Sequence, residues 1–331
     1  MPTKTDFPAT STIEAKRKGA LSATLERLIL PIVWIAMIVI FGALAPETFL
    51  SWTNISNVLG AQAILFMLAL GALLPVLVGD FDLSLGGIMG IAAATVGVLN
   101  VKMGLPIAVA CAAAVVFALL AGCLNAFLVV TLDTNPLIVT LGTGTVYTGI
   151  LYFLVNSSTI SGVDRALSVA TFSTRIAGIS LAFYYVVALM LILWYITAWT
   201  PIGLRARFVG QSHAVARLSG VNVNRMRWGG FVGGAVIVGL AGILLVGLTG
   251  AVDPTASGSY LLPAYAAVFL GATTISPGRF NAIGTGIAVY FLATGVNGLQ
   301  ILGAQSYVQQ LFYGAALVIA VVLARWMRRR A

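Results

Sequence analysis

The sequence predicts an all-α integral membrane protein with about ten transmembrane helices and an inverted internal repeat. Of its 331 residues, 60% are hydrophobic and only 8% are charged, whereas about a quarter of the residues in an ordinary soluble domain are charged. The apolar residues fall into ten segments, and a pattern of leucine, glycine and acidic residues occurs in both halves of the chain. Most of the chain is therefore expected to lie in the hydrocarbon of a membrane.

Ten segments qualify as candidate spans, because roughly 20 apolar residues are needed to cross about 30 Å of hydrocarbon. They cover residues 28–45, 56–79, 85–101, 105–130, 136–155, 181–199, 229–250, 261–275, 282–301 and 306–324. The eighth is short, and both the third and the eighth follow a turn that contains glycine and an acidic residue. One of these two is a candidate for a broken or re-entrant helix buried in protein.

The basic residues predict the orientation of the chain. With an even number of spans and a cytoplasmic N-terminus, both ends of the chain, the 200–228 loop and the 276–281 turn lie inside. Fifteen of the 18 Lys and Arg residues are then cytoplasmic, and three lie outside: Lys102, Arg165 and Arg175. This split explains the net charge of +9 better than nucleic-acid binding does. The expected layout is a tail at 1–27, a membrane domain at 28–325 and a basic tail at 326–331.

An internal repeat is seen when the chain is compared with itself at an offset of 171 positions. The residues Leu73, Leu74, Leu77, Gly79, Asp82, Ser84 and Gly87 then align with Leu244, Leu245, Leu248, Gly250, Asp253, Thr255 and Gly258. Five spans separate the copies, so the repeat is predicted to be inverted across the membrane, as in many transporters. The halves would cover about 55–180 and 226–325; chance alignment of leucine and glycine is the alternative.

Asp82 and Asp253 occupy matching positions in this repeat, each two residues before a hydroxyl group. A carboxylate there can accept backbone hydrogen bonds from the first turn of a following helix and lie at the positive end of its dipole. We expect both to be structural helix caps. A proton relay is the alternative, but the inverted repeat separates the two by most of about 30 Å of hydrocarbon, with no ionisable group between them.

No catalytic or metal-binding constellation is visible. His213 is the single histidine, and none of the four lysines follows a glycine, which excludes a P-loop. Cys111 and Cys123 lie within one apolar segment and are expected to be packing thiols. No span carries Lys, Arg or Glu at mid-depth, whereas ion-coupled carriers usually need buried ionisable groups. We therefore expect a partner to supply the energy for transport.

The 200–228 loop, the longest one predicted on the cytoplasmic side, contains the signals of a short helix. Ser212 can cap a helix that begins at the next residue, and Gly220 suits the left-handed position that ends it. Val215 and Leu218 lie three apart on one side of this helix. Such a helix could dock in a groove of another protein; a solvated connector is the alternative.

Four stretches, in chain order, resemble the permease subunits of the ribose, xylose and galactose class of ABC importers. They are GDFDLSLGG at 79–87, NPLIVTLGTGTVYTGI at 135–150, ARLSGV at 216–221 and GTGIAVYFLATGVNGLQILGAQSYVQQLFYGAALVIAVV at 284–322. The resemblance covers nearly the whole chain from about residue 55. The departures are Asp80 where glycine is usual, Ala126 after Asn125, Ser212 and His213 in place of acidic residues, and residues 276–279 in place of a glycine-rich turn.

The resemblance implies a translocation subunit, not an enzyme, that moves a sugar or similar small polar solute inward by alternating access. The partners it implies are ABC ATPase subunits, a second permease copy or a similar permease, a periplasmic solute-binding protein and membrane lipid, with no nucleic acid. The chain itself would bind no cofactor or metal, because the partner ATPase would use ATP and Mg²⁺. It would be a multi-pass protein of the bacterial inner membrane with both termini cytoplasmic.

The resemblance also implies roles for two groups of residues. Those expected to couple the chain to the ATPase are Ser212, His213, Val215, Arg217, Leu218, Ser219 and Gly220. Those expected to line the translocation pathway are Asn125, Thr140, Thr143, Asn297 and Gln300. Buried amides and hydroxyls in membranes also commonly bridge helices, so a structural role is the alternative for each residue of the second group.

Two other classes of function stay open at this point. A stand-alone secondary carrier or uniporter for a small polar solute is the main alternative, since the lack of intramembrane charge argues only against its ion-coupled form. A membrane enzyme or receptor is more distant, because His, Asp, Glu and Cys are nowhere clustered. Co-purification would discriminate these classes, since an importer should bring down an ATPase.

Overall fold

The computed structural model describes residues 28–328, and it describes side chains as far as Leu323. The expected tails at 1–27 and 326–331 lie outside the part whose side chains are described. Within residues 28–328 the chain is mostly helical, with four strands of two residues each. This agrees with the predicted all-α class.

Among the described residues, eight helices are long and apolar enough to cross a membrane. They are α3 (Trp52–Ala61) continued by α4 (Ala63–Leu77), α5 (Leu85–Gly97), α6 (Ile107–Ala126), α7 (Pro136–Val155), α9 (Leu181–Trp199), α12 (Val223–Thr249), α14 (Ala282–Ile301) and α15 (Ser306–Arg328). Short π-helical stretches extend α5 over Val98–Lys102 and α6 over Phe127–Thr131. All eight overlap predicted spans.

The other two predicted spans are shorter. The first is the apolar helix Leu28–Leu44, and the eighth is α13 (Leu261–Gly271), which follows a 3₁₀ turn at Ser257–Tyr260. At a rise of 1.5 Å per residue, the 11 residues of α13 reach only about 16 Å. Most of α13 is buried, as a broken helix within a membrane protein must be. The count of ten spans is therefore not confirmed, whereas the short, buried eighth segment agrees with expectation.

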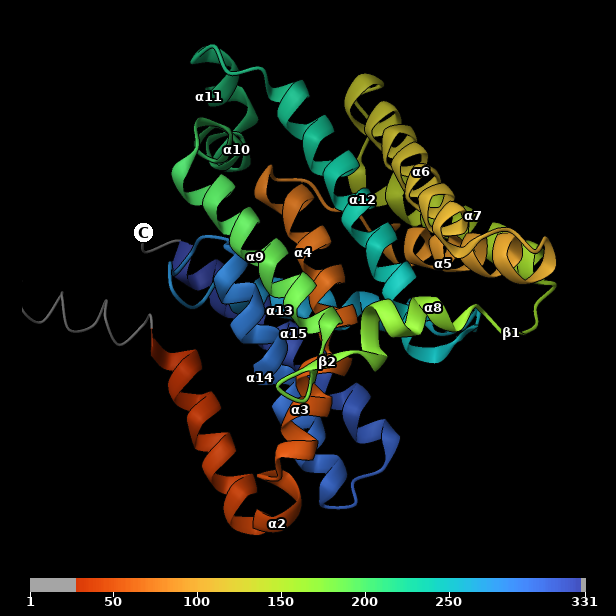
Figure 1. Ribbon diagram of the computed structural model, residues 1–331. Coiled ribbons are helices and arrows are strands. Elements are labelled where there is room, and N and C mark those ends of the chain that lie inside the picture. The colour runs from red at the N-terminus through yellow and green to blue at the C-terminus, as the bar shows by residue number, and fades with distance from the viewer. Residues whose placement is uncertain (1–27, 329–331) are drawn as a thin grey trace, which may run out of the picture.

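The remaining elements are short and lie near the ends of the long helices. They are α2 (Pro46–Phe49), β1 (Ile160–Ser161), α8 (Arg165–Ser168) with a π-helical stretch at Val169–Ser173, β2 (Arg175–Ile176), β3 (Ile179–Ser180), α10 (Pro201–Gln211), α11 (His213–Leu218) and β4 (Ala251–Val252). β1 pairs antiparallel with β4, and β2 with β3. α10 and α11 lie near the start of α12, whereas β4 follows its other end (Figure 1).

The long helices form a buried central group and an exposed outer group. Of the 18 most apolar consecutive residues in each span, 72% are buried in α3–α4 and also in α5, whereas only 6% are buried in α15. α4 and α12 lie side by side and touch at glycines, since a Cβ on Gly71 would come within 2.5 Å of Val238 Cγ2 and 2.9 Å of the Gly234 carbonyl oxygen. Small residues permit this close approach, which drives helix association in lipid. The outer helices α6, α7, α9 and α15 expose apolar side chains suited to lipid or to another subunit.

Candidate functional site

The 200–228 loop folds into two short helices that project from the end of α9 (Figure 1). The Ser212 hydroxyl caps α11 by accepting the Val215 N–H at 3.4 Å, and Gly220 has a φ of 78°, the left-handed conformation. The predicted capped helix is therefore confirmed. α10 was not predicted, although the Pro201 that opens it is a common first residue of a helix.

One side of α11 exposes apolar side chains to solvent, whereas another side packs against the rest of the protein. Leu218 is 90% exposed and Val215 is 50% exposed. Ala216 is fully buried in a small apolar cluster with Val78, Val209 and Val223. The rest of the predicted coupling set is exposed or half-exposed: Ser212, His213, Arg217, Ser219 and Gly220. An exposed leucine on a helix that is itself held in place by packing is suited to bind in a groove of another protein.

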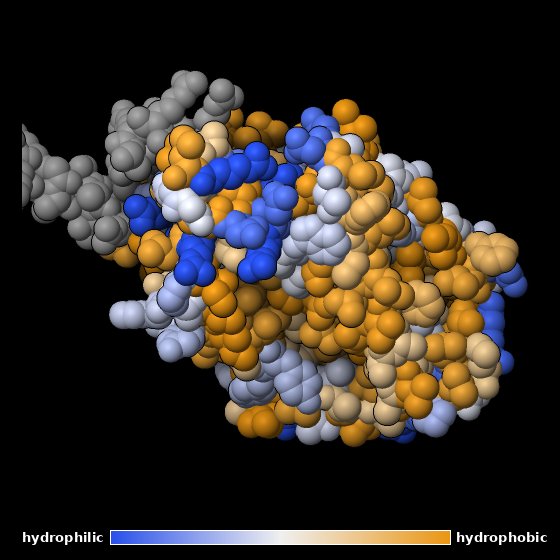
Figure 2. Space-filling model, turned by 90° about the horizontal axis from the view of Figure 1, so that it is seen from above, coloured by the Kyte–Doolittle hydropathy of each residue, from blue (hydrophilic) through white to orange (hydrophobic). Residues whose placement is uncertain are grey.

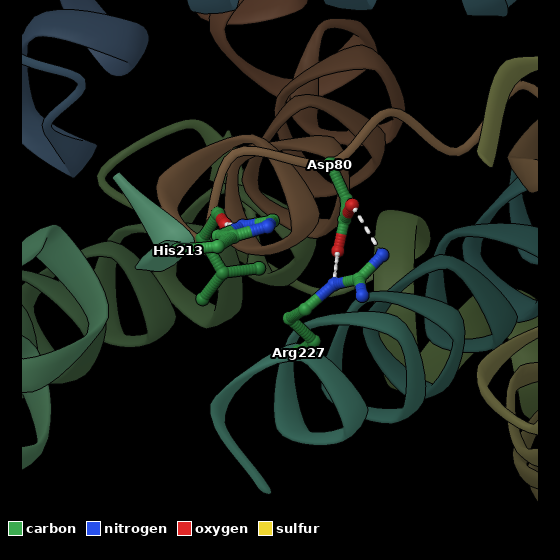
Figure 3. Close-up of polar contacts among 4 residues, drawn as sticks. Asp80, His213 and Arg227 are labelled. Atoms are coloured by element: carbon green, nitrogen blue, oxygen red, sulfur yellow. Dashed lines mark hydrogen bonds and ion pairs between the residues drawn. The ribbon is translucent and has the colours of Figure 1, made fainter. Parts of the chain in front are cut away.

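The base of α11 contacts the C-terminal end of α4 (Figure 3). His213 Nε2 lies 2.8 Å from the Val78 carbonyl oxygen. Gly79 has a φ of 87° and lies against Gly210 of α10, and a Cβ on Gly210 would collide with the Leu77 carbonyl. The backbone at the end of α4 therefore fits directly against the segment predicted to couple to a partner.

Asp80, at the end of the same turn, forms a buried ion pair with Arg227 of α12 (Figure 3). Arg227 Nε donates to Oδ2 at 2.7 Å, and Nη2 donates to Oδ1 at 2.9 Å. Both side chains are almost fully buried, so each charge depends on the other for compensation. The predicted span began at residue 229, whereas α12 begins at Val223 and carries Arg227 into the bundle. The aspartate in place of the family's usual glycine was the one signal of this pair.

A second buried polar cluster surrounds Asp82, in the connection between α4 and α5. Oδ1 of this fully buried carboxylate accepts the N–H and the hydroxyl of Ser84. Asn125 of α6 donates to the Ser84 hydroxyl at 2.6 Å, and Tyr147 of α7 donates to Asn125 at 3.3 Å. Oδ2 of Asp82 has no hydrogen-bond partner among the described residues. Burial raises the pKa of Asp82 to about 6, because it disfavours the charged form.

Two further side chains complete this cluster. The Thr140 hydroxyl of α7 accepts the Leu83 N–H at 3.0 Å. The Tyr265 hydroxyl of α13 accepts the Asp82 N–H at 3.1 Å and donates to the Asp82 carbonyl at 2.7 Å. The cluster thus joins the start of α5 to α6, α7 and α13. Asn125 and Thr140 are fully buried, so in this conformation they bridge helices and do not face an open pathway.

The other predicted pathway residues lie apart from this cluster. Asn297 of α14 is half-buried and exchanges two hydrogen bonds with Asn54 of α3, at 3.0 and 3.1 Å. Gln300 is exposed and donates to Gln309 at 3.1 Å. Thr143 is half-buried on α7, with its hydroxyl 3.4 Å from the Thr140 carbonyl. The five residues are therefore not brought together into one lining within this chain.

Asp253, just after β4, makes the same turn as Asp82 but is exposed. Its Oδ1 accepts the N–H and the hydroxyl of Thr255, both at 2.8 Å. These bonds lower the pKa of Asp253, because they favour the charged form. Both carboxylates lie before the helices they were expected to cap, since Ser84 is the N-cap of α5 and the 3₁₀ turn begins at Ser257. They close the turns that lead into these helices.

The described residues show no grouped metal ligands. Between residues 28 and 323, no three His, Cys, Asp or Glu side chains lie close enough together to hold a metal ion. Cys111 and Cys123 are unpaired and half-buried.

Comparison with known proteins establishes the family. Residues 54–321 match the family described as the branched-chain amino acid transport system / permease component. The chain belongs to this family. The permease is 32% identical over 296 residues to the ribose import permease protein of Bacillus subtilis (strain 168), which covers 89% of this chain and 92% of that protein.

Other relatives of the permease are named for import of other solutes. It is 28% identical over 293 residues to the D-allose transport system permease protein of Escherichia coli (strain K12), covering 87% of this chain and 88% of that protein. It is 28% identical over 261 residues to an autoinducer 2 import system permease protein of Salmonella typhimurium, covering 77% and 78%. No solved structure matches the chain. The permease is thus a membrane subunit of an ABC importer, in which ATP hydrolysis belongs to a separate subunit.

Proposed function

We propose that the permease moves a sugar or a similar small polar solute into the cell by alternating access. Two of its relatives are named for ribose and D-allose, which are sugars, although the family description refers to amino acids. The polar groups that are candidates for transient contact with such a solute are Thr143, Asn297 and Gln300, because each is at least partly accessible. Asn125 and Thr140 would contact solute only in another conformation.

The ATPase and the solute-binding protein would lie on opposite faces of an inner membrane. ATPase subunits that use ATP and Mg²⁺ would bind on the cytoplasmic side, where positive-inside orientation puts α10, α11 and both termini. A periplasmic solute-binding protein would deliver the solute to the other face. A second permease copy or a similar permease would complete the pathway.

The observation that carries this proposal is that α11 exposes the apolar side chain of Leu218 while another side of the helix is packed against the protein. Leu218 is almost wholly exposed, yet the helix that holds it contacts the end of α4 through Ala216 and His213. A partner that binds Leu218 and moves α11 would therefore also move the backbone of α4. That backbone leads directly through Asp80 to the buried cluster around Asp82.

Replacing Leu218 with aspartate tests the docking role. We expect this change to abolish co-purification of the ATPase and to reduce solute uptake at least tenfold, because an apolar anchor in a desolvated groove dominates such contacts. The permease should still insert, since the Leu218 side chain is 90% exposed. Met103→Asp is the matched control: this side chain is 62% exposed in the connection between α5 and α6, on the predicted outer side, and its replacement should leave both readouts near the parental level.

Two results would contradict the proposal. One is normal ATPase binding and normal uptake by Leu218→Asp, which would make α11 a connector only. The other is uptake that persists in cells lacking the ATPase, which would favour a uniporter.

A further inference from the structure

A cavity of about 520 Å³ opens on the same end of the molecule as α10 and α11. It lies between the end of α4, α10 and the turn that follows α13. Leu204, Phe208 and Phe280 line its apolar part, and Arg207, Gln211 and Arg279 line its polar part. Figure 2, which views the molecule from above, shows strongly hydrophilic surface gathered around a hollow in a largely apolar face.

The two arginines of this cavity lack a counter-charge within the described residues. In residues 28–323 the one ion pair is that between Asp80 and Arg227. Arg207 Nε is buried and has no hydrogen-bond partner among the residues that the structure describes. Burial, followed by the nearby charge of Arg279, lowers the pKa of Arg207. Two guanidinium groups in one cavity with an unused buried donor form a site for an anion, because arginine forks bind phosphate and carboxylate oxygens strongly.

The surroundings favour the phosphate of a lipid over a soluble anion. α10 exposes Ile202 (58%) and Leu204 (70%) beside its arginines, the composition of a helix that lies in the membrane interface. Basic pockets at the cytoplasmic ends of transmembrane helices bind the head groups of anionic lipids. Free phosphate shares this head-group chemistry but would leave the apolar part of the cavity unfilled.

We propose that Arg207 and Arg279 bind the phosphate group of an anionic phospholipid from the cytoplasmic leaflet. The glycerol and the first methylenes of the lipid lie against Leu204 and Phe280. This site depends on the cytoplasmic orientation of α10 but not on the identity of the solute. Because Gly210 of α10 touches the end of α4, the bound lipid stabilises the contact between these two helices.

The test uses the full-length permease purified in detergent, with the Arg207→Gln/Arg279→Gln double variant. The control, Arg205→Gln/Arg225→Gln, removes the same number of positive charges from exposed positions of the 200–228 loop that do not line the cavity. Retained lipid is measured by native mass spectrometry after titration with phosphatidylglycerol or phosphatidylcholine. Parent and control should retain phosphatidylglycerol preferentially. The double variant should lose this preference by about tenfold or more, because it removes both charge-assisted contacts to the lipid phosphate, which the control leaves in place.

Three outcomes would overturn the proposal. Unchanged phosphatidylglycerol retention in the double variant would show that the lipid binds elsewhere, and an equal loss in the control would show that only general charge matters. A third outcome would assign the cavity to a soluble anion. In it, inorganic phosphate raises the unfolding temperature of the parent but not of the double variant, and the parent retains phosphatidylglycerol no better than phosphatidylcholine. Arg279→Gln alone, on an exposed turn, gives the same readout if the double variant does not fold.

Discussion

Asp82 and Asp253 make the same turn in two different surroundings. In each, one carboxylate oxygen accepts the N–H and the hydroxyl of the residue two positions later. Asp82 is fully buried beside α6, α7 and α13, whereas Asp253 is exposed next to β4. The local bonds are therefore set by the Asp-x-Ser/Thr spacing, and the fold alone decides whether the charge is solvated.

The difference gives the two carboxylates opposite electrostatic character. Burial raises the pKa of Asp82, whereas the bonds from Thr255 lower the pKa of Asp253. Asp82 also keeps one buried oxygen without a partner among the described residues, and two residues earlier Asp80 is buried with a full ionic partner. The α4–α5 connection thus contains two buried carboxylates, whereas the matching turn after β4 contains one carboxylate that is exposed to solvent.

The largest effect is expected from the ion pair that accompanies the buried turn. Arg227→Met should destabilise the permease by about 3 to 5 kcal/mol, because it leaves Asp80 buried without compensation. Adding Asp80→Asn should restore much of the loss, since neither charge of this pair then remains. Thermal unfolding in detergent would measure both variants. Equal stability of the single and double variants would show that the two charges are independent.

The next largest effect is expected from replacing the aspartate of each turn, which tests directly whether burial makes the two turns different. Asp82→Leu should lower stability by about 2 to 4 kcal/mol and abolish uptake, because it leaves Ser84 donors unpaired in the interior. Asp253→Leu should lower stability far less, since water can satisfy the same groups of Thr255. Membrane insertion, unfolding temperature and uptake should be measured side by side. A similar loss in both variants would show that the shared turn matters more than burial.

A smaller, graded effect is expected from pH. The raised pKa of Asp82 favours its protonated form in the folded state, so its stabilising contribution is present below about 3.8 and is lost as pH rises through about 6. Asp253 acts oppositely: its contribution is present above 3.8 and is lost as pH falls through its lowered pKa. The unfolding temperature of the parent should therefore fall between pH 4 and pH 7, and Asp82→Asn should flatten this decline. An unchanged slope in Asp82→Asn would assign it to other groups.

The features that sequence reasoning could reach are those with local signals. Ser212 and Gly220 bracket α11 because capping depends on a few neighbouring residues, and the turns at Asp82 and Asp253 follow from spacing alone. The Asp80–Arg227 pair joins residues 147 positions apart, and only the packing of α12 against α4 brings them together. The burial of Asn125 and Thr140 is likewise a property of helix packing, so their polarity alone suggested a pathway.

The smallest effect is expected for Asp253→Asn, and it separates the turn from proton transfer. Asparagine keeps the carbonyl oxygen that accepts both bonds from Thr255 but cannot carry a proton, so uptake should stay within about twofold of the parent and stability within about 0.5 kcal/mol. The exposed position of Asp253 supports this expectation, because water replaces whatever the lost charge had stabilised. The same variant should also leave uptake insensitive to dissipation of the proton gradient at constant ATP. Loss of uptake in well-inserted Asp253→Asn, together with collapse of parental uptake when the gradient is dissipated, would instead make Asp253 a proton carrier and would contradict transport driven by ATP.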